Sequence, residues 1–110
     1  MKYFQIPCPI RLKNLFTDED GELVTFAQIA VHWANDPVWS EQKANLASLV
    51  LVIGELRKPP LAWVALENAD HALLARAVEA RSPQPPPVLI QIQPFFDAIL
   101  KAVSEKPEGV

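Results

Sequence analysis

Residues 44–54 constrain the fold of this chain more than any other stretch, because they contain no charged side chain. They lie within a helical pattern that is apolar around most of the helix circumference. Such a helix must be covered on several sides, so it is either the central helix of the domain or a contact surface for another chain.

Two proline signals bound this helix. Asp36-Pro37 and Ser40-Glu41 both offer a start, and Pro59-Pro60 ends the helical pattern. The sequence therefore predicts a long helix that begins within residues 37–41 and continues to Arg57.

A helical wheel divides the side chains of this helix into three strips. The broad apolar face consists of Leu46, Leu49, Val50, Ile53 and Leu56. A narrow polar stripe contains Asn45, Ser48 and Glu55 and is centred on Val52. The third strip consists of Ala47, Leu51 and Gly54, whose small members would admit a close neighbour.

Trp39 lies at the junction before this helix, beside a proline and among polar residues. Core and contact roles are equally open for it, since tryptophan serves both. We predict that Trp39 and the strip Ala47, Leu51 and Gly54 bind a protein partner.

The N-terminal part of the chain predicts a β-hairpin over residues 9–25. Apolar and basic side chains alternate over residues 10–13, and an acidic run with an Asp-Gly step at residues 18–22 precedes a second apolar run. Prolines at positions 7 and 9 exclude a regular helix before it and favour a broken extended segment.

A first helix is predicted directly after the hairpin. Thr25 is a suitable N-cap, and apolar residues then recur with helical spacing up to the Asp36-Pro37 step. The predicted inward residues are Phe26, Ile29, Ala30 and Trp33, and the outward ones are Gln28, His32 and Asn35. Trp33, and also Trp63 further along, are predicted to lie in the core.

The second half of the chain predicts one strand and two further helices. Residues 61–66 are a short apolar run that favours a strand paired with the hairpin. Asn68 is expected to cap a helix that continues to Arg81 and directs His71 outward. A proline-rich spacer at residues 82–87 follows. Residues 88–93 alternate as in a strand, but the helical spacing of the apolar residues after them favours one helix throughout, kinked at Pro94, before a frayed tail over residues 104–110.

These segments together predict one domain spanning residues 1–110, of the α+β class and dominated by helices. It has an N-terminal β-hairpin, one further short strand and about four helices. Half of the residues are hydrophobic, which suffices for a core that needs no disulfide, metal or cofactor.

Charge and cysteine content narrow the choice of partners. The formal net charge is −3, and there is no clustering of Lys and Arg for phosphate binding, so nucleic acid is disfavoured. Cys8 is the single cysteine, which favours a reducing compartment. No apolar run has the length of a membrane span, and the N-terminus lacks a signal-peptide pattern. We expect a cytoplasmic protein.

Residues with catalytic chemistry are few. Cys8 sits between two prolines without a neighbouring base, and His32 has only Asp36 at the following helical turn. The acidic run at residues 18–22 lacks the spacing of a calcium loop. The sequence predicts a protein that is not an enzyme and has no metal site. A small enzyme with His32, Asp36 and Cys8 brought together by the fold is the alternative.

Several strings in the chain resemble short proteins encoded among the structural and assembly genes of tailed bacteriophages. They are Val24-Thr25-Phe26-Ala27, Trp33, Asp36-Pro37-Val38-Trp39, Leu66-Glu67-Asn68-Ala69-Asp70 leading into Leu73-Leu74, and Pro94-Phe95-Phe96-Asp97-Ala98. The resemblance implies a tail-assembly chaperone or another accessory of virion morphogenesis, which are binding roles without catalysis. It identifies no functional residue.

The function predicted from the sequence is a small non-catalytic protein-binding or assembly factor. Its partner is a protein, either a second copy in a homo-oligomer or a foreign chain. A second binding hypothesis is an inhibitor of a host protein, which uses the acidic turn at residues 18–22 as a decoy for a basic surface.

Overall fold

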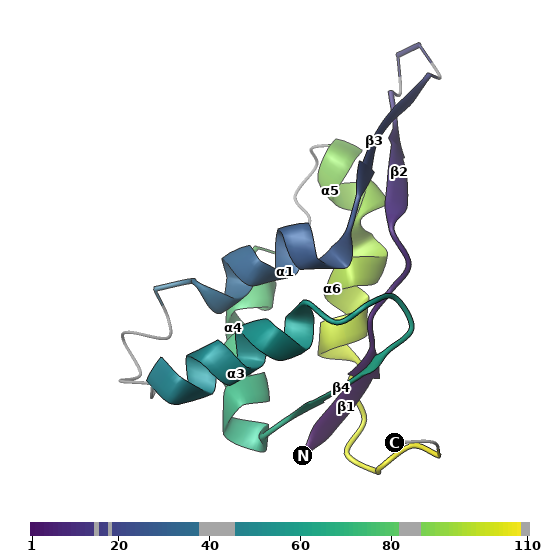
Figure 1. Ribbon diagram of the computed structural model, residues 1–110. Helices are drawn as coiled ribbons and strands as arrows, with labels where there is room; N and C mark the ends of the chain where they lie inside the picture. Colours follow the sequence, from purple (N-terminus) through teal and green to yellow (C-terminus); the bar gives the residue numbers. More distant parts are fainter. Residues whose placement is uncertain (15, 18, 38–45, 82–86, 109–110) are drawn as a thin grey trace.

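The computed structural model describes all residues except 15, 18, 38–45, 82–86 and 109–110. The described part has an α+β fold dominated by helices, as predicted (Figure 1). Its strands are β1 (Lys2–Gln5), β2 (Ile10–Lys13), β3 (Asp20–Val24) and β4 (Trp63–Leu66). Its helices are α1 (Phe26–Ala34), α3 (Leu46–Leu56), α4 (Asn68–Ala80), α5 (Pro87–Gln91) and α6 (Gln93–Leu100).

The predicted hairpin is present as the antiparallel pair β2–β3. Ile10 faces Val24, Arg11 faces Leu23, and Lys13 faces Asp20, with an irregularity in register between Arg11 and Lys13. Figure 1 shows the hairpin at one end of the molecule, where it begins beside α5 and its far end extends beyond the helices. It therefore forms an arm.

β4 pairs with β1, so the predicted pairing of residues 61–66 with the hairpin is wrong. Tyr3 faces Ala65 in an antiparallel register, and Tyr3 also exchanges two backbone hydrogen bonds of 2.9 Å with Val103. Pro7 and Pro9 lie between β1 and β2 and cannot donate backbone hydrogen bonds. The chain therefore leaves one sheet at β1 and begins a second sheet at β2.

α1 begins with the capping arrangement that the sequence predicts. The Gln28 backbone N–H donates to Thr25 Oγ1 at 3.3 Å, and the Thr25 backbone N–H donates to Gln28 Oε1 at 2.9 Å. These two bonds satisfy two backbone donors that a helix start leaves open. The buried residues of α1 are Phe26, Ala30, Trp33 and Ala34.

α4 begins one residue earlier than predicted, because its N-cap is Glu67 and not Asn68. β4 ends at Leu66, so a single extended residue connects strand to helix and the cap position falls on Glu67. His71, predicted outward, is buried, with Nε2 2.8 Å from the Ile99 carbonyl oxygen. α4 packs against α6 at this point, and Ile99 lies in the last turn of α6, where carbonyls lack helical partners.

Residues 87–100 are helical, and the helix breaks at Ile92, two residues before the predicted kink. Ile92 is the N-cap of α6 and Pro94 lies in its first turn, where proline is tolerated. Phe95, Phe96 and Ile99 are buried. Most of the predicted proline-rich spacer, residues 82–86, lies outside the described residues, and its last residue, Pro87, begins α5.

The core is centred on Phe26. Its ring lies edge-on to those of Phe4, Trp33 and Phe95, with centroids 5.7 to 6.3 Å apart. Trp33 is buried, as predicted, but Trp63 is only half-buried, because it lines a shallow depression beside Tyr3 at the surface of the β1–β4 sheet.

Candidate functional site

α3 packs on the body of the protein with one side. Val52 and Leu56 are buried, Leu49 and Ile53 are half-buried, and α3 contacts α1, β4 and α4. Figure 1 shows α3 below α1 and in front of α4, at the surface of the molecule. The rest of the helix faces away from the core.

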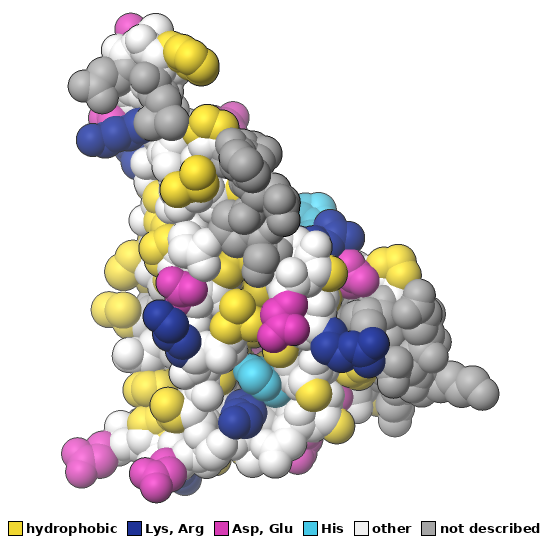
Figure 2. Space-filling view, turned by 180° about the vertical axis from the view of Figure 1, so that it is seen from behind, with side chains coloured by type: hydrophobic (Ala, Val, Ile, Leu, Met, Phe, Trp, Pro, Cys, Tyr) yellow, Lys and Arg dark blue, Asp and Glu magenta, His cyan; other side chains and the backbone are white. Residues whose placement is uncertain are grey.

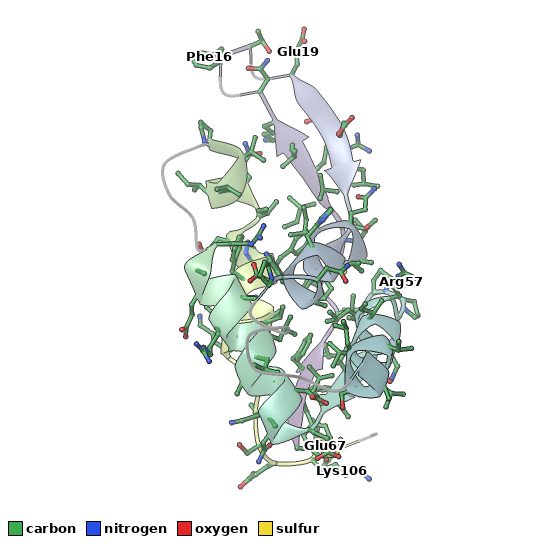
Figure 3. All side chains as sticks on the ribbon, turned by 90° about the vertical axis from the view of Figure 1, so that its left-hand side faces the viewer. Phe16, Glu19, Arg57, Glu67 and Lys106 are labelled. Carbon is green, nitrogen blue, oxygen red and sulfur yellow. The ribbon has the colours of Figure 1, made fainter. Side chains whose placement is uncertain are left out.

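The outward side of α3 carries apolar residues. Leu51 is 70% exposed and Val50 is 62% exposed. Ala47 and Gly54 are also exposed and lie one turn before and one turn after this pair. This spacing places the four residues on one side of the helix, and we call them the α3 strip. Figure 3 shows α3 at the outside of the molecule, with Arg57 just beyond its end.

The helical wheel identified three members of the α3 strip but misplaced two valines. Val50 was placed on the broad apolar face and is exposed, whereas Val52 was placed at the centre of the polar stripe and is buried. In this orientation Glu55 accepts a hydrogen bond from the Ala65 backbone N–H at 3.3 Å, and Val52 is buried.

Gly54 is not required by the packing of this chain. A Cβ atom built at this position would meet no atom within 4 Å. A glycine within a helix costs about 1 kcal/mol relative to alanine. The residue is therefore either tolerated near the end of α3 or serves a close approach by another chain.

The fourth predicted contact residue, Trp39, lies outside the described residues. The predicted start of the long helix, within residues 37–41, also lies outside them except for Pro37, which is in a turn. The described part of that helix begins at Leu46 and ends at Leu56, one residue before the predicted end at Arg57.

The three residues of the alternative enzyme hypothesis do not share a cleft in the described structure. Cys8 is exposed between two prolines that lie near Thr25, at the start of α1. His32 is exposed in the last turn of α1. These two ends are separated by about 10 Å of helix. Asp36 is paired with Arg81 at 2.8 Å.

His32 instead borders an open groove of about 440 Å³ between α1 and α5. Apolar side chains line most of it, namely Ile29, Trp33, Leu89, Ile92 and Phe96, and Ala80 and Arg81 complete the wall. The Arg81 guanidinium is held by Asp36, through Nη2 at 2.8 Å and Nε at 3.0 Å. The groove therefore presents an apolar floor with a largely neutralised rim.

Charged side chains of both signs are interspersed on the face shown in Figure 2 and do not gather into a basic patch there. Within the described ranges, no group of three or more His, Cys, Asp or Glu residues lies close enough to hold a metal ion. None of the described helices has the length and apolar character needed to cross a membrane.

Comparison with protein-family models, curated proteins and solved structures finds no match to this chain. Its function must therefore be inferred from its own residues.

Proposed function

We propose that this protein is a non-catalytic protein-binding factor whose contact surface is the α3 strip. The observation that carries the proposal is the exposure of Leu51 and Val50, at 70% and 62%, in the most apolar helix of the described chain. Adjacent exposed aliphatic side chains on a regular helix present a surface that another apolar surface can cover.

The only charged residue of α3 supports this assignment. Glu55 is directed to β4 and paired with Lys58 at 2.7 Å, so it does not interrupt the strip. A partner can cover the strip without desolvating a charge, which would otherwise reduce the gain from burying apolar surface.

The strip by itself is small. The described helix has eleven residues and is about 16 Å long, and the strip is one side of it. A stable interface buries roughly 800 Å² on each partner, which is more surface than four residues on one side of a short helix offer. The interface therefore extends beyond the strip or is weak. Association should be measured up to high protein concentration.

Within this class, the sequence resemblance supports a tail-assembly chaperone or another virion accessory that acts in the host cytoplasm. Such a role involves either a homo-oligomer or a complex with a structural protein. A second copy that uses the same strip would form a two-fold symmetric contact.

Light scattering coupled to size-exclusion chromatography, over a wide range of concentration, tests the proposal. We expect a defined oligomer whose association Leu51→Glu abolishes while the thermal midpoint changes by only a few degrees. Leu61→Glu is the matched control, because Leu61 is 62% exposed and lies outside the strip. Equal effects of the two variants would contradict the proposal.

If light scattering shows a monomer at every concentration, the proposal is tested next with a foreign partner protein. Leu51→Glu and Leu61→Glu would then be compared for binding to the isolated phage tail proteins that the resemblance suggests. Unfolding of Leu51→Glu would show instead that Leu51 belongs to the core.

A further inference from the structure

The two sheets have four outer edges, and among the described residues three of them are contacted by segments outside their own sheet. An uncovered edge carries backbone N–H and C=O groups that can pair with another chain, and proteins usually protect such edges. The coverage of each edge therefore indicates where a further strand could add.

Both edges of the β1–β4 sheet are covered. Tyr3 of β1 exchanges two backbone hydrogen bonds of 2.9 Å with Val103. On the other edge, the Ala65 N–H donates to Glu55 Oε2 at 3.3 Å, and Lys58 Nζ donates to the Trp63 carbonyl at 3.2 Å. Glu55 and Lys58 thus take the place of a neighbouring strand.

The outer edge of β2 is covered by one side chain. Gln91 of α5 accepts a hydrogen bond from the Lys13 N–H at 2.7 Å and donates one to the Lys13 carbonyl at 3.0 Å. The carboxamide reproduces the two bonds that a paired strand would make at this position.

The outer edge of β3 is the exception. Among the described residues, no backbone group of another element bonds to it, and its single side-chain contact is the Arg11 guanidinium, 3.1 Å from the Gly21 carbonyl. Gln91 shows that Lys13 directs its backbone groups outward, so those of Asp20, which faces it in the antiparallel ladder, are directed outward as well. The register irregularity between Arg11 and Lys13 interrupts the regular alternation beyond this pair.

The charges beside this edge select its occupant. Glu19, Asp20 and Glu22 are exposed, and residues 19–24 contain no basic side chain. A second copy added through the same edge would place these carboxylates against their own counterparts, which is unfavourable. An extended segment that carries Lys or Arg would pair with them, and its apolar residues would meet Leu23, which is 50% exposed.

We propose that the outer edge of β3 is a second binding site, which accepts a basic, extended segment of a partner protein as an added antiparallel or parallel strand. Backbone hydrogen bonds supply the pairing, and the acidic side chains supply the preference for a basic partner. The site is separate from the α3 strip, so it does not depend on the function proposed above.

Nuclear magnetic resonance titration with synthetic peptides tests this site. The probe is a capped peptide of alternating lysine and valine, added up to millimolar concentration to the full chain. We expect chemical-shift changes centred on residues 20–24 and slower exchange of the Asp20 amide hydrogen. A peptide with glutamate in place of lysine should not bind. The lysine peptide with its central amides N-methylated should lose binding, because it keeps its charge but cannot pair along one edge.

Substitutions at the edge of β3 test whether the lysine peptide binds there. Asp20→Lys combined with Glu22→Lys should weaken binding of the lysine peptide roughly tenfold. The control combines Glu79→Lys with Glu108→Lys, two exposed acidic positions elsewhere, and changes the net charge by the same amount. Leu51→Glu should leave peptide binding unchanged.

Four results of the peptide experiments would overturn the proposal. They are unaltered binding of the N-methylated peptide, equal effects of the two charge variants, no binding of the lysine peptide at any concentration reached, and loss of peptide binding in Leu51→Glu. The last result would place the peptide on the α3 strip and would leave the function proposed above standing. Self-association that is lost only in Asp20→Lys with Glu22→Lys would show that the occupant is a second copy, not a basic segment.

Discussion

Helices α1 and α3 pack against each other, yet they differ in how they dispose of their apolar residues. α1 buries its two large aromatic residues, Phe26 and Trp33, and leaves Gln28 and His32 exposed. α3 is the more apolar helix, but Leu51 and Val50 remain outside. An apolar side chain is buried only where the fold provides a neighbour. Within the described part of the chain, no neighbouring segment buries the exposed apolar side chains of α3.

The largest test of this contrast compares two truncations. Phe26→Ala removes a ring that contacts three other aromatic rings, and we expect it to lower the free energy of unfolding by about 3–5 kcal/mol. Leu51→Ala should change it by less than about 0.5 kcal/mol. Urea unfolding at low protein concentration measures both values. A comparable loss in Leu51→Ala would show that the α3 strip belongs to the core.

Two valines of α3 sharpen the comparison within one helix. Val52→Ala should lower the free energy of unfolding by about 2 kcal/mol, because Val52 is buried against the core. Val50→Ala makes the same chemical change at an exposed position and should cost less than about 0.5 kcal/mol. If the two costs were equal, the orientation of α3 described above would be wrong.

The start of α1 is expected to contribute less than its core. Thr25→Ala removes the hydroxyl that accepts from the Gln28 N–H and should cost about 1 kcal/mol. Thr17→Ala is the matched control, because Thr17 is exposed in the turn between β2 and β3. Thermal unfolding at one pH resolves the difference, and equal midpoints for the two variants would argue against the capping role.

Gly54 separates folding from binding. Gly54→Ala should raise the free energy of unfolding by about 0.5–1 kcal/mol, since the added methyl meets open space and alanine favours a helix. Ala72→Gly, at an exposed position of α4, should lower it by a similar amount. If a partner approaches Gly54 closely, Gly54→Ala will weaken association despite the added stability. Unchanged association would show that this glycine is merely tolerated.

The smallest effect concerns the start of α4, which lacks the side-chain cap found in α1. Burial, and to a lesser extent repulsion by Glu67, raises the pKa of Asp70 above 3.8. Folding therefore favours protonated Asp70. The resulting stabilisation is fully present below pH 3.8 and is lost as the pH rises through the higher pKa of the folded state.

Carbonyl chemical shifts of Asp70 followed against pH measure that pKa. Glu67→Gln should lower it part of the way toward 3.8, because the substitution removes the repulsion but not the burial. A pKa unaffected by Glu67→Gln would leave burial as the single cause.

Local patterns predicted the elements of the fold well. The hairpin, the Thr25 cap, the strand before α4 and the helix favoured after residue 87 all depend on neighbours within a few positions. Pairings across the chain were not predictable in this way. The partner of β4 is β1, which is far away in sequence, and the inward turn of His71 depends on the Ile99 carbonyl.

The candidate site was likewise predictable in its local features and not in its contacts across the chain. The composition of α3 alone marks it as a helix with more apolar surface than one neighbour can cover, and the wheel identifies Ala47, Leu51 and Gly54 as one strip. The wheel could not determine which strip faces the core, because apolar residues occupy most of the helix circumference and Val52 lies within the polar stripe. In the assembled fold, Val52 and Leu56 are buried, Glu55 accepts from the Ala65 N–H, and Val50 is left outside.

The sequence by itself determined the fold class and the surplus of apolar surface on α3, since both follow from residue type and local spacing. Only the tertiary structure decided which faces and edges remain open. Glu55, Lys58, Gln91 and Val103 cover three sheet edges through contacts between segments distant in sequence, and β3 has no such neighbour among the described residues. Whether a sheet edge is covered depends on the folded chain, because a residue distant in sequence can bond to that edge only where the tertiary fold places it beside the edge.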